Sequence, residues 1–254
     1  MMRTITIGGS RLTIEPLTPN SEKIWTKAER GAWESETFAF IRTTVDEDTL
    51  FVDIGAWVGA MSLVAATRAR RVVAIEPDPV AVAELERNVA LNGGRVEVWQ
   101  KAVDTNKGTL VLYQNRCLGD SGTSSFGRGA ALAVDAVTFD DLAEQITGSS
   151  KVCVKVDIEG HEYCIADQLI EFVFRHDAYL HLSLHPQILV YSGTMSRFRC
   201  FVETWDIIRR LMLIGAVRLA KTGTRATIIT LIWYILLAPR PRNFSVTVNP
   251  SRTD

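Results

Sequence analysis

The sequence predicts an α/β protein with a doubly wound, mainly parallel sheet, and three observations support this prediction. The apolar segment Leu50–Ile54 runs into a glycine turn that ends at Gly59, and a helix-forming run follows at once. A second apolar segment, Val72–Ile75, ends in the acid Glu76 about twenty residues later. Strand and helix patterns then alternate along most of the chain, which is the rhythm of βαβ units. Because glycine lets a backbone approach a bulky ligand, the first turn predicts a cofactor site.

The bulk composition excludes several classes of protein. The 254 residues carry a net charge of −1, and the sequence pI is about 6.4. This balance gives no sign of nucleic acid or an anionic membrane surface as a partner. The most apolar run, Ala226–Ala238, is too short for a membrane span, which needs about twenty residues. The segment Met1–Glu15 lacks the apolar core of a signal peptide, so we expect a cytoplasmic protein without a membrane span.

The four cysteines are widely separated and form no CxxC pair. This spacing argues against a disulfide framework and against a structural metal site. Reduced thiols agree with the cytoplasmic location, and no metal is expected. The cysteines are Cys117, Cys153, Cys164 and Cys200.

The N-terminal segment, residues 1–45, predicts a hairpin followed by helices. Arg3–Ile7 and Arg11–Ile14 alternate apolar and polar residues around a Gly-Gly-Ser sequence that suits a tight primed turn. After a break with two prolines, short helices are predicted over Glu22–Arg30 and Phe38–Val45.

The central segment, residues 46–242, predicts one domain of alternating strands and helices. Pro77 and Pro79 begin a helix that Gly93 and Gly94 end, and Thr138 caps another helix. The predicted strands are Leu50–Ile54, Val72–Glu76, Val96–Gln100, Thr109–Tyr113, Val134–Val137, Lys151–Asp157, Ala178–Leu184, Ala216–Ala220 and Ile228–Leu237. The predicted helices are Ala60–Arg68, Val80–Leu91, Phe139–Ile146, a helix ending near Val173, and Met195–Ile214.

Two further segments stand apart from this pattern. Residues 115–131 are rich in glycine and serine, and loops of this length in a compact domain are usually binding elements or disorder. Residues 243–254 predict a loose C-terminal tail.

Charged side chains and histidines gather near two strand ends. Strand alternation places Lys155, Asp157 and Glu159 on one face, where a buried sheet tolerates few ionised groups. A structural ion pair between Lys155 and Glu159 would account for part of this charge. The same alternation places His181 and His185 on one face, with His185 at the carboxyl end of its strand. That end is the ligand-binding edge of a doubly wound sheet.

Three segments carry a family resemblance, and they occur in order over roughly residues 33–190. They are Val52–Gly59, Ala74–Pro77 and Val154–Glu162. Weaker matches are Trp33-Glu34 with Thr37, Lys101–Asp104 with Gly108, and Thr123–Phe126. With these segments the chain resembles the class I S-adenosylmethionine-dependent methyltransferases, and specifically the FkbM family.

The resemblance implies a Rossmann-like sheet of seven strands with one antiparallel strand, and helices on both faces. It implies S-adenosylmethionine as cofactor and O-methylation of a sugar, polyol or natural-product acceptor. The acceptor would be a small molecule, such as a glycoside. In-line transfer then needs an aligned nucleophile and one general base. The N-terminal helices would form a lid over the pocket, with Trp33 and Glu34 above the cofactor.

The resemblance also implies the residues that bind the cofactor. The turn with Gly55, Ala56 and Gly59 would pass beneath the methionine part, and Asp53 would order the turn or meet the amine through water. Glu76, followed by Pro77, would accept hydrogen bonds from both ribose hydroxyls, although an acid before a helix is also a common structural feature. Ala102 and Asp104 would flank the adenine. Asp157 would lie beside the sulfonium.

The catalytic prediction names Asp157, Glu159 and His185. Asp157 would hold the acceptor, Glu159 would order the site or accept a proton, and His185 would be the general base, because an imidazole titrates near working pH. Structural histidines are common, and no spacing demands a metal site from His181, His185 and a carboxylate.

Two other functions fit parts of the sequence. A nicotinamide-dependent oxidoreductase would use the same architecture, but it favours a central glycine at the position that Trp57 occupies. A non-catalytic S-adenosylmethionine-binding module would keep Glu76 and lose the acceptor site.

Overall fold

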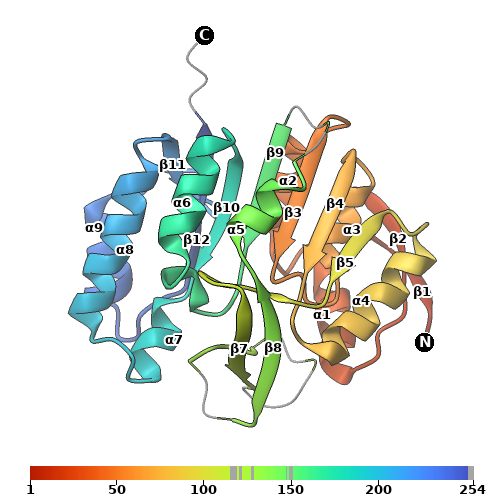
Figure 1. The fold of residues 1–254 in the computed structure, drawn as a ribbon, viewed down its shortest axis with the longest axis horizontal. Helices are drawn as coiled ribbons and strands as arrows, with labels where there is room; N and C mark the ends of the chain where they lie inside the picture. Colours follow the sequence, from red (N-terminus) through yellow and green to blue (C-terminus); the bar gives the residue numbers. More distant parts are fainter. Residues whose placement is uncertain (115–118, 120–121, 127–128, 147, 149–150, 251–254) are drawn as a thin grey trace.

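The computed structural model describes residues 1–114, 119, 122–126, 129–146, 148 and 151–250. A central sheet lies between two layers of helices (Figure 1). The strands are β1 Arg3–Ile7, β2 Ser10–Ile14, β3 Thr49–Ile54, β4 Arg71–Ile75, β5 Val96–Trp99, β6 Ala102–Val103, β7 Gly108–Tyr113, β8 Ala131–Val137, β9 Lys151–Val156, β10 Tyr179–Leu184, β11 Gly215–Leu219 and β12 Phe244–Pro250. The helices are α1 Pro19–Glu29, α2 Ser35–Thr44, α3 Ala60–Ala66, α4 Pro79–Leu91, α5 Phe139–Ala143, α6 Ala166–Arg175, α7 Pro186–Tyr191, α8 Arg197–Leu211 and α9 Ile228–Leu231, with a 3₁₀ turn at His161–Tyr163 and a π-helical segment at Ile232–Leu237.

The central sheet has seven strands in the order β11-β12-β10-β9-β3-β4-β5. Neighbouring strands from β10 to β5 pair in parallel, and β12 pairs antiparallel with both β10 and β11. This confirms the predicted mainly parallel sheet with one antiparallel strand. From β3 the chain runs outward through β4 and β5, and then returns to the other side of β3 with β9. The carboxyl ends of β3 and β9 therefore form a topological switch point, where α/β sheets bind ligands.

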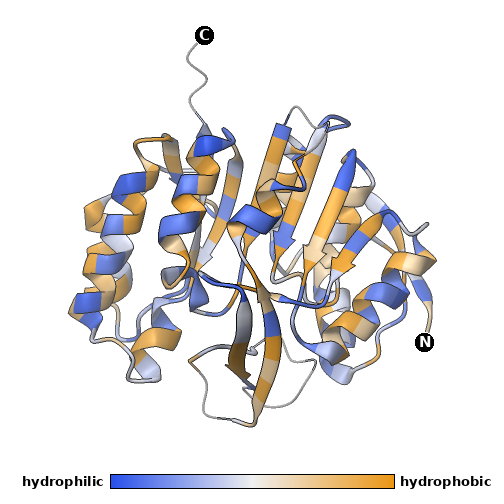
Figure 2. Cartoon of the chain, in the orientation of Figure 1, coloured by the Kyte–Doolittle hydropathy of each residue, from blue (hydrophilic) through white to orange (hydrophobic). Residues whose placement is uncertain are grey.

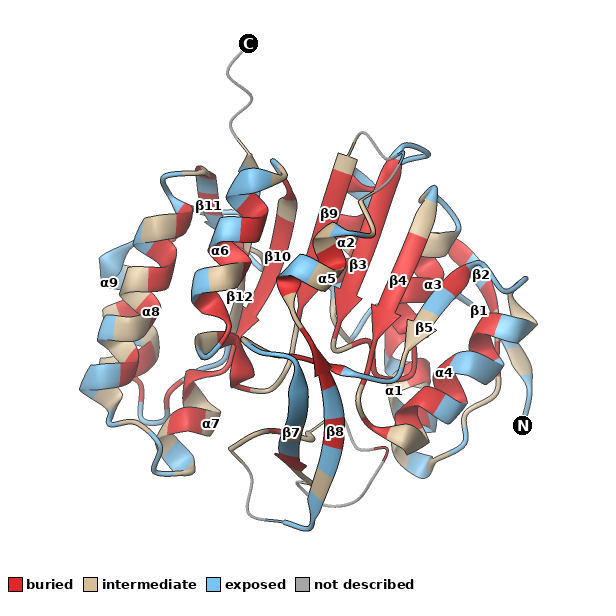
Figure 3. Cartoon of the chain, viewed as in Figure 1, coloured by how far each residue is buried: buried red, intermediate tan, exposed pale blue. Residues whose placement is uncertain are grey.

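The sheet buries an apolar core on each face, which confirms the doubly wound arrangement. One core contains side chains of α5, α6 and α8, and the other contains side chains of the hairpin and of α1 to α4. Figure 2 shows the hydrophobic residues along the central strands, and Figure 3 shows that the same strands are buried. Helices on both faces explain why β3 is buried at every residue.

Two smaller sheets flank the central one. Strands β1 and β2 form the predicted hairpin, and Gly8 and Gly9 both have positive φ, as a primed two-residue turn requires. Strands β6, β8 and β7 form a three-stranded sheet beyond the carboxyl ends of the parallel strands (Figure 1). Part of the predicted loop 115–131 lies outside the described residues. Its Ser124 pairs with Tyr113 in an isolated bridge.

The C-terminal region differs from its prediction at two places. Residues 228–237 form helical turns instead of a strand, because Leu231 and Ile235 are buried while Ile229 and Trp233 point outward. Residues 244–250 are not loose but form β12, and Val246 and Val248 are fully buried between β10 and β11. None of the helices formed by the described residues is long and apolar enough to cross a membrane.

The residues that α8 buries differ in part from the apolar residues that the sequence of this helix would place in the core. In the sequence, Phe198 and Met212 recur at helical spacing with Phe201, Trp205 and Ile208, but Phe198 is 68% exposed and Met212 is 38% exposed. The helix α8 instead buries Cys200, Ile207 and Leu211 together with Ile208.

Candidate functional site

A pocket opens at the carboxyl ends of β3, β4 and β9, and we call it the strand-end pocket. Five predicted cofactor residues line it together: Gly55, Glu76, Pro77, Ala102 and Asp157. Its remaining walls are mostly apolar and come from both the central and the small sheet. They include Ile54, Ile75, Val103, Leu110, Leu112 and Ile158.

Glu76 is the buried carboxylate of this pocket, and it is 7% exposed. Its two oxygens accept hydrogen bonds from the backbone N–H groups of Trp57, at 2.8 Å, and Asp78, at 2.9 Å. Burial raises the pKa of Glu76 to about 7, although these two hydrogen bonds act in the opposite direction. Since a carboxylate oxygen has two lone pairs, each oxygen retains one for a ligand hydroxyl.

The turn after β3 brings two indole rings together. Trp57 has a left-handed backbone conformation, with φ of 47°, and its Nε1 donates a hydrogen bond to the carbonyl of Gly119. The ring of Trp33 meets the ring of Trp57 edge-on, with 6.2 Å between centroids. A recess next to the strand-end pocket is lined by Trp33, Glu34, Ala56 and Asp157, and we call it the Trp33 recess. Trp33 and Glu34 of the predicted lid therefore lie beside the strand-end pocket. The closure of this lid over a bound cofactor stays a prediction.

Asp53 and Lys155 form a buried ion pair across the paired strands β3 and β9. Their charged atoms are 3.1 Å apart, and the Lys155 ammonium also donates a hydrogen bond to the carbonyl of Gly55. Burial opposes a charge on Lys155, but Asp53 and Asp157 raise its pKa above the ordinary value. The parallel register places Asp53 directly opposite Lys155, which explains this pairing, and the alternative of a pair between Lys155 and Glu159 stays a prediction.

The described contacts of Asp53 order the turn. Its other oxygen accepts a hydrogen bond from the hydroxyl of Ser62 on α3, and the side chain is fully buried. Of the two predicted roles, the contact with a cofactor amine through water stays a prediction.

Packing explains why glycine occupies positions 55 and 59 of the turn, in addition to the predicted role of these glycines beneath the cofactor. A Cβ atom on Gly55, which has φ of 79°, would lie 1.9 Å from the carbonyl oxygen of Asp157. A Cβ atom on Gly59, which has φ of 90°, would lie 2.4 Å from Leu85 on α4. Gly59 lines neither the strand-end pocket nor the Trp33 recess, so its place in the structure is explained by helix packing.

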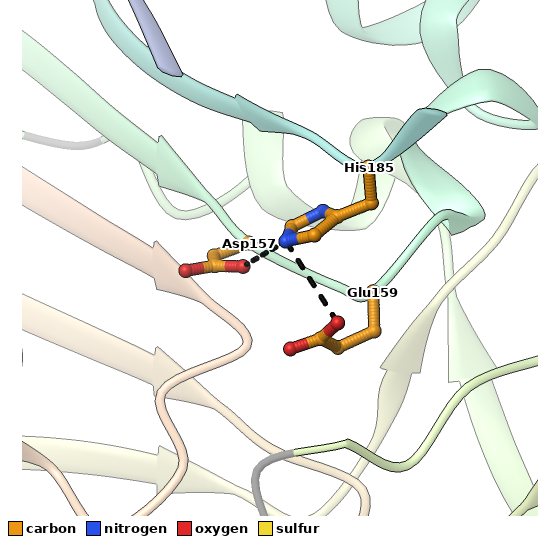
Figure 4. A group of neighbouring side chains, drawn as sticks. All are labelled: Asp157, Glu159 and His185. Carbon is orange, nitrogen blue, oxygen red and sulfur yellow. Dashed lines mark ion pairs between the residues drawn. The ribbon is translucent and has the colours of Figure 1, made fainter. Parts of the chain in front are cut away.

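The three predicted catalytic side chains meet at the ends of β9 and β10, and we call them the strand-end cluster (Figure 4). The Nε2 atom of His185 lies 3.4 Å from Asp157 Oδ1 and 3.8 Å from Glu159 Oε2. On its other side, His185 Nδ1 lies 2.9 Å from the carboxylate of Glu162. Glu162 is 1% exposed and also accepts hydrogen bonds from the backbone N–H groups of Ile158 and Gly160.

These carboxylates determine the charge of the imidazole. Burial alone would lower the pKa of His185, but Glu162, Asp157 and Glu159 together raise it to about 10. The imidazole of the ligand-free chain is therefore protonated at neutral pH. Burial and the charge of Asp157 also raise the pKa of Glu34, whose carboxylate accepts a hydrogen bond from the Thr37 hydroxyl.

A third pocket, which we call the C-terminal pocket, lies on the other side of the strand-end cluster. Its volume is about 310 Å³, which is in the range of small-molecule sites. Asp157 and His185 line it together with polar and aromatic residues from the C-terminal segments. These are Ser183, Lys221, Tyr234, Arg242, Asn243, Phe244 and Ser245, with Glu34 and Glu36 from the N-terminal side.

Sequence reasoning missed Tyr234, Asn243, Phe244 and Ser245, because it interpreted 228–237 as a strand and 243–254 as a tail. It also gave no role to His161, which lines the strand-end pocket. The ring of His161 contacts the carboxylate of Asp104, at 3.1 Å, and the hydroxyl of Ser125, at 2.9 Å. Asp104 therefore anchors His161, whereas the preceding residues Lys101, Ala102 and Val103 line the pocket. The position of His161 directly after the Asp-Ile-Glu-Gly sequence was the available signal.

His181 lies apart from the strand-end cluster. It is fully buried, its Nε2 contacts the Thr37 hydroxyl, and its ring packs against Phe40. Burial lowers the pKa of His181 to about 4, so the ring is neutral. A structural histidine explains these contacts.

The switch-point pocket, its buried carboxylate and the strand order define a class I S-adenosylmethionine-dependent methyltransferase fold. Residues 53–177 match the methyltransferase FkbM domain. The chain belongs to the FkbM methyltransferase family, and S-adenosylmethionine is its cofactor. This assignment overturns the alternative of a nicotinamide-dependent oxidoreductase.

One curated relative is the hexuronic acid methyltransferase AglP of Haloferax volcanii. It is 25% identical over 154 residues, which are 60% of this chain and 61% of that protein. The chain thus spans about three fifths of the length of this relative.

Two solved structures are among the similar ones. They are methyltransferase FkbM from Methylobacillus flagellatus, with 15% identity, coverage of 91% of this chain and 55% of that chain, and a TM-score of 0.45, and an rRNA methylase from Streptococcus thermophilus, with 9% identity, coverage of 93% and 99%, and a TM-score of 0.43. Because both TM-scores lie below 0.5, the assignment rests on the domain match and the topology.

Proposed function

We propose that the chain transfers a methyl group from S-adenosylmethionine to a hydroxyl oxygen of a sugar or another polyhydroxylated small molecule. The observation that carries this proposal is the position of Asp157. Asp157 lines the strand-end pocket, the Trp33 recess and the C-terminal pocket. A residue shared by all three lies where a donor in the first two and an acceptor in the third would meet.

The residues of the strand-end pocket fit the cofactor. The free lone pairs of Glu76 suit a ribose diol, and the apolar walls with Ala102 suit an adenine ring. When bound, S-adenosylmethionine supplies an electrophilic methyl group and its own leaving group. The chain then has to align the acceptor, exclude water and remove one proton.

The C-terminal pocket favours a polyhydroxylated acceptor. Ser183, Tyr234, Asn243 and Ser245 line it, and their hydroxyl and amide groups are of the kind that pairs well with sugar hydroxyls. The hexuronic acid methyltransferase relative also acts on a sugar, which supports the same acceptor class.

Proton removal falls to the strand-end cluster. As the new C–O bond forms and the S–C bond breaks, the hydroxyl proton must leave the acceptor oxygen. Asp157, Glu159 and His185 are ionisable groups at the junction of the pockets, and Glu34 lines both the Trp33 recess and the C-terminal pocket. We assign the proton to this cluster and the alignment of its carboxylates to His185, whose Nε2 faces both of them.

Calorimetry tests the cofactor half of the proposal. S-adenosylhomocysteine is expected to bind the wild-type protein, Glu76→Ala should weaken this binding at least tenfold, and NAD should not bind. Tight binding of NAD would overturn the proposal, and so would the absence of binding of both S-adenosylmethionine and S-adenosylhomocysteine.

A methylation assay with a panel of glycosides and uronic acids tests the acceptor half. Methylation of at least one sugar is expected, and Asp157→Asn should lower kcat while the affinity for S-adenosylhomocysteine changes less than the rate. Cofactor binding without transfer to any member of the panel would favour the non-catalytic alternative. An unchanged rate in His185→Ala would show that His185 does not align these carboxylates for the reaction.

A further inference from the structure

We propose that the strand-end cluster binds a divalent metal ion, of which Mn²⁺ is the best match. This inference deepens the proposed function, on which it rests for the purpose of the ion, while binding of the ion is a separate property. Asp157, Glu159 and His185 each offer one ligand atom, and these atoms all lie within 4.8 Å of one another. Their arrangement is drawn in Figure 4.

The distances require only a small closure around an ion. Ligand atoms that are about 2.2 Å from one cation lie about 3.1 Å apart when they occupy adjacent positions. His185 Nε2 is 3.4 Å from Asp157 Oδ1 and 3.8 Å from Glu159 Oε2. Side-chain shifts of about 0.3 Å for Asp157 and about 0.7 Å for Glu159 would bring the two carboxylates to this separation from Nε2.

The backbone after β9 presents Glu159 to the cluster. Glu159 has φ of 53°, and Gly160 has φ of 102°, so two successive residues adopt the left-handed region. Non-glycine residues rarely adopt it, and such outliers gather at ligand-binding sites. This turn brings the carboxylate of Glu159 toward the end of β10, where His185 begins α7.

A buried second carboxylate orients the imidazole, as in many metal sites. Glu162 accepts the Nδ1 hydrogen of His185 and is itself held by the backbone N–H groups of Ile158 and Gly160. A carboxylate on one ring nitrogen directs the other nitrogen to the metal and raises its basicity. The hydrogen bond to Glu162 thus turns the Nε2 atom of His185 toward Asp157 and Glu159. A cluster of acidic residues alone would lack this oriented nitrogen.

The charge of the group also favours a dication. Three carboxylates surround a single imidazole, so that the group stays negative even when His185 is protonated. The nearby cation Lys155 already pairs with Asp53. An ion at Nε2 would replace one proton and add positive charge where the carboxylates converge.

The donor set and the position indicate the kind of ion and its use. Two carboxylate oxygens and one imidazole nitrogen suit Mn²⁺ better than Mg²⁺, because Mg²⁺ prefers oxygen ligands only. They also suit Mn²⁺ better than Zn²⁺, whose sites are rich in histidine or cysteine. Asp157 and His185 line the C-terminal pocket, so that the ion would have coordination positions open toward an acceptor. A hydroxyl bound there would lose its proton more readily.

The test is direct binding of Mn²⁺ to protein that has been stripped of metal with a chelator. Calorimetry measures the binding, and the electron paramagnetic resonance signal of free Mn²⁺ measures how much of the ion stays unbound. One Mn²⁺ per chain is expected to bind. The isosteric variants Asp157→Asn and Glu159→Gln should each weaken binding at least tenfold, and thermal melting without metal should show that both are folded. Glu36→Gln, which removes an acid of the same pocket outside the cluster, should bind Mn²⁺ within twofold of wild type.

Absence of binding up to millimolar Mn²⁺, or equal affinity in wild type and both cluster variants, would overturn the metal site. The methylation assay separates this result from the proposed function. Methyl transfer by chelator-treated protein that binds no Mn²⁺ would leave the function intact and remove the ion. Specific Mn²⁺ binding without transfer to any acceptor would keep the site and remove the function.

Discussion

Glu76 shows how a single residue serves both the fold and the ligand. Its carboxylate joins the turn after β3 to the start of α4 through hydrogen bonds from Trp57 and Asp78. The same carboxylate is buried in the strand-end pocket, and burial raises its pKa to about 7. The residue therefore changes charge near physiological pH.

The affinity for S-adenosylhomocysteine is expected to depend on pH through Glu76. The ionised carboxylate accepts ribose hydroxyl hydrogens better than the protonated acid, and with a pKa of about 7 the ionised fraction falls about tenfold between pH 8 and pH 6. Calorimetry over this range should show a comparable loss of affinity. The matched variant Glu76→Gln should bind more weakly with a flat profile, and the same slope in both proteins would contradict the assignment.

The stability of the ligand-free protein should depend on the same group. The pKa of Glu76 is raised from 4.5 in the folded state, so its protonation contributes stability that is fully present below pH 4.5 and is lost as the pH rises through about 7. Glu76→Gln should therefore lose less melting temperature than wild type between pH 5 and pH 8. Parallel pH profiles of Tm would refute this.

Gly55 should tolerate alanine much less well than Gly9. Both have positive φ, but a Cβ on Gly55 would meet the Asp157 carbonyl at 1.9 Å, and a Cβ on Gly9 would meet no atom within 4 Å. Gly9→Ala should cost only the backbone strain of about 1 kcal/mol, and Gly55→Ala at least about 3 kcal/mol. Urea unfolding measures both, and similar losses would show that backbone strain alone limits Gly55.

Residues at strand ends could be predicted from the sequence, and their partners could not. Glu76 and Asp157 follow apolar strands, and parallel strands present their carboxyl ends at one edge. The partner of Lys155 depends on the register between β3 and β9, which are about 100 residues apart in the chain. No local pattern contains that register.

At the scale of elements, α4 holds the N-terminal segment on the domain. Glu84 of α4 is 1% exposed and accepts hydrogen bonds from the backbone of Leu17, the hydroxyl of Ser21 and the indole of Trp25. Asn88, one turn later, accepts the backbone N–H of Glu15. The hairpin and α1 are therefore anchored by polar side chains as well as by apolar packing.

Replacement of Glu84 should destabilise the protein far more than replacement of its neighbour. Glu84→Ala leaves the Leu17 N–H and the Trp25 indole without their acceptor, whereas the Ser21 hydroxyl keeps the Thr18 carbonyl. At about 1–3 kcal/mol for each donor that loses its acceptor, a loss of about 3 kcal/mol is expected. Glu86→Ala on the exposed side of α4 should change stability by less than about 0.5 kcal/mol. Denaturant unfolding of both variants tests this, and equal effects would show that the anchor is unimportant.

The C-terminal elements show where sequence patterns are ambiguous. The run from Ile228 to Leu237 is apolar at nearly every position, so it has neither a helical nor a strand period. Its β-branched residues favour a strand, but packing against α8 selects helical turns. The segment Phe244–Pro250 does alternate, with Val246 and Val248 inward, yet its polar residues hid a central strand.

At the scale of the whole molecule, β12 joins two parts of the sheet. It lies between β10 and β11 and pairs antiparallel with both. Without it, the described strand β11 has no paired neighbour in the central sheet. The same segment contributes Phe244 and Ser245 to the C-terminal pocket, so that pocket depends on β12 as well.

A charge inside β12 should unfold this half of the protein. Val248 is fully buried and is paired with Leu180 and Val217, so Val248→Asp places an unpaired carboxylate in the core and should cost more than about 4 kcal/mol. Asn249 on the same strand is exposed, so Asn249→Asp should leave the free energy of unfolding nearly unchanged. Circular dichroism and thermal melting compare the two variants, and a folded Val248→Asp protein with unchanged Tm would contradict this role of β12.

The position of β12 also has a consequence for synthesis on the ribosome. About 60 residues separate the end of β10 from the start of β12, and at 5–20 residues per second the ribosome needs roughly 3–12 s to add them. During that interval β10 presents an unpaired strand edge, and α8 is made before the sheet beneath it is complete. Open strand edges recruit other chains. The nascent protein therefore passes through a period in which a chaperone that covers exposed edges would raise its yield.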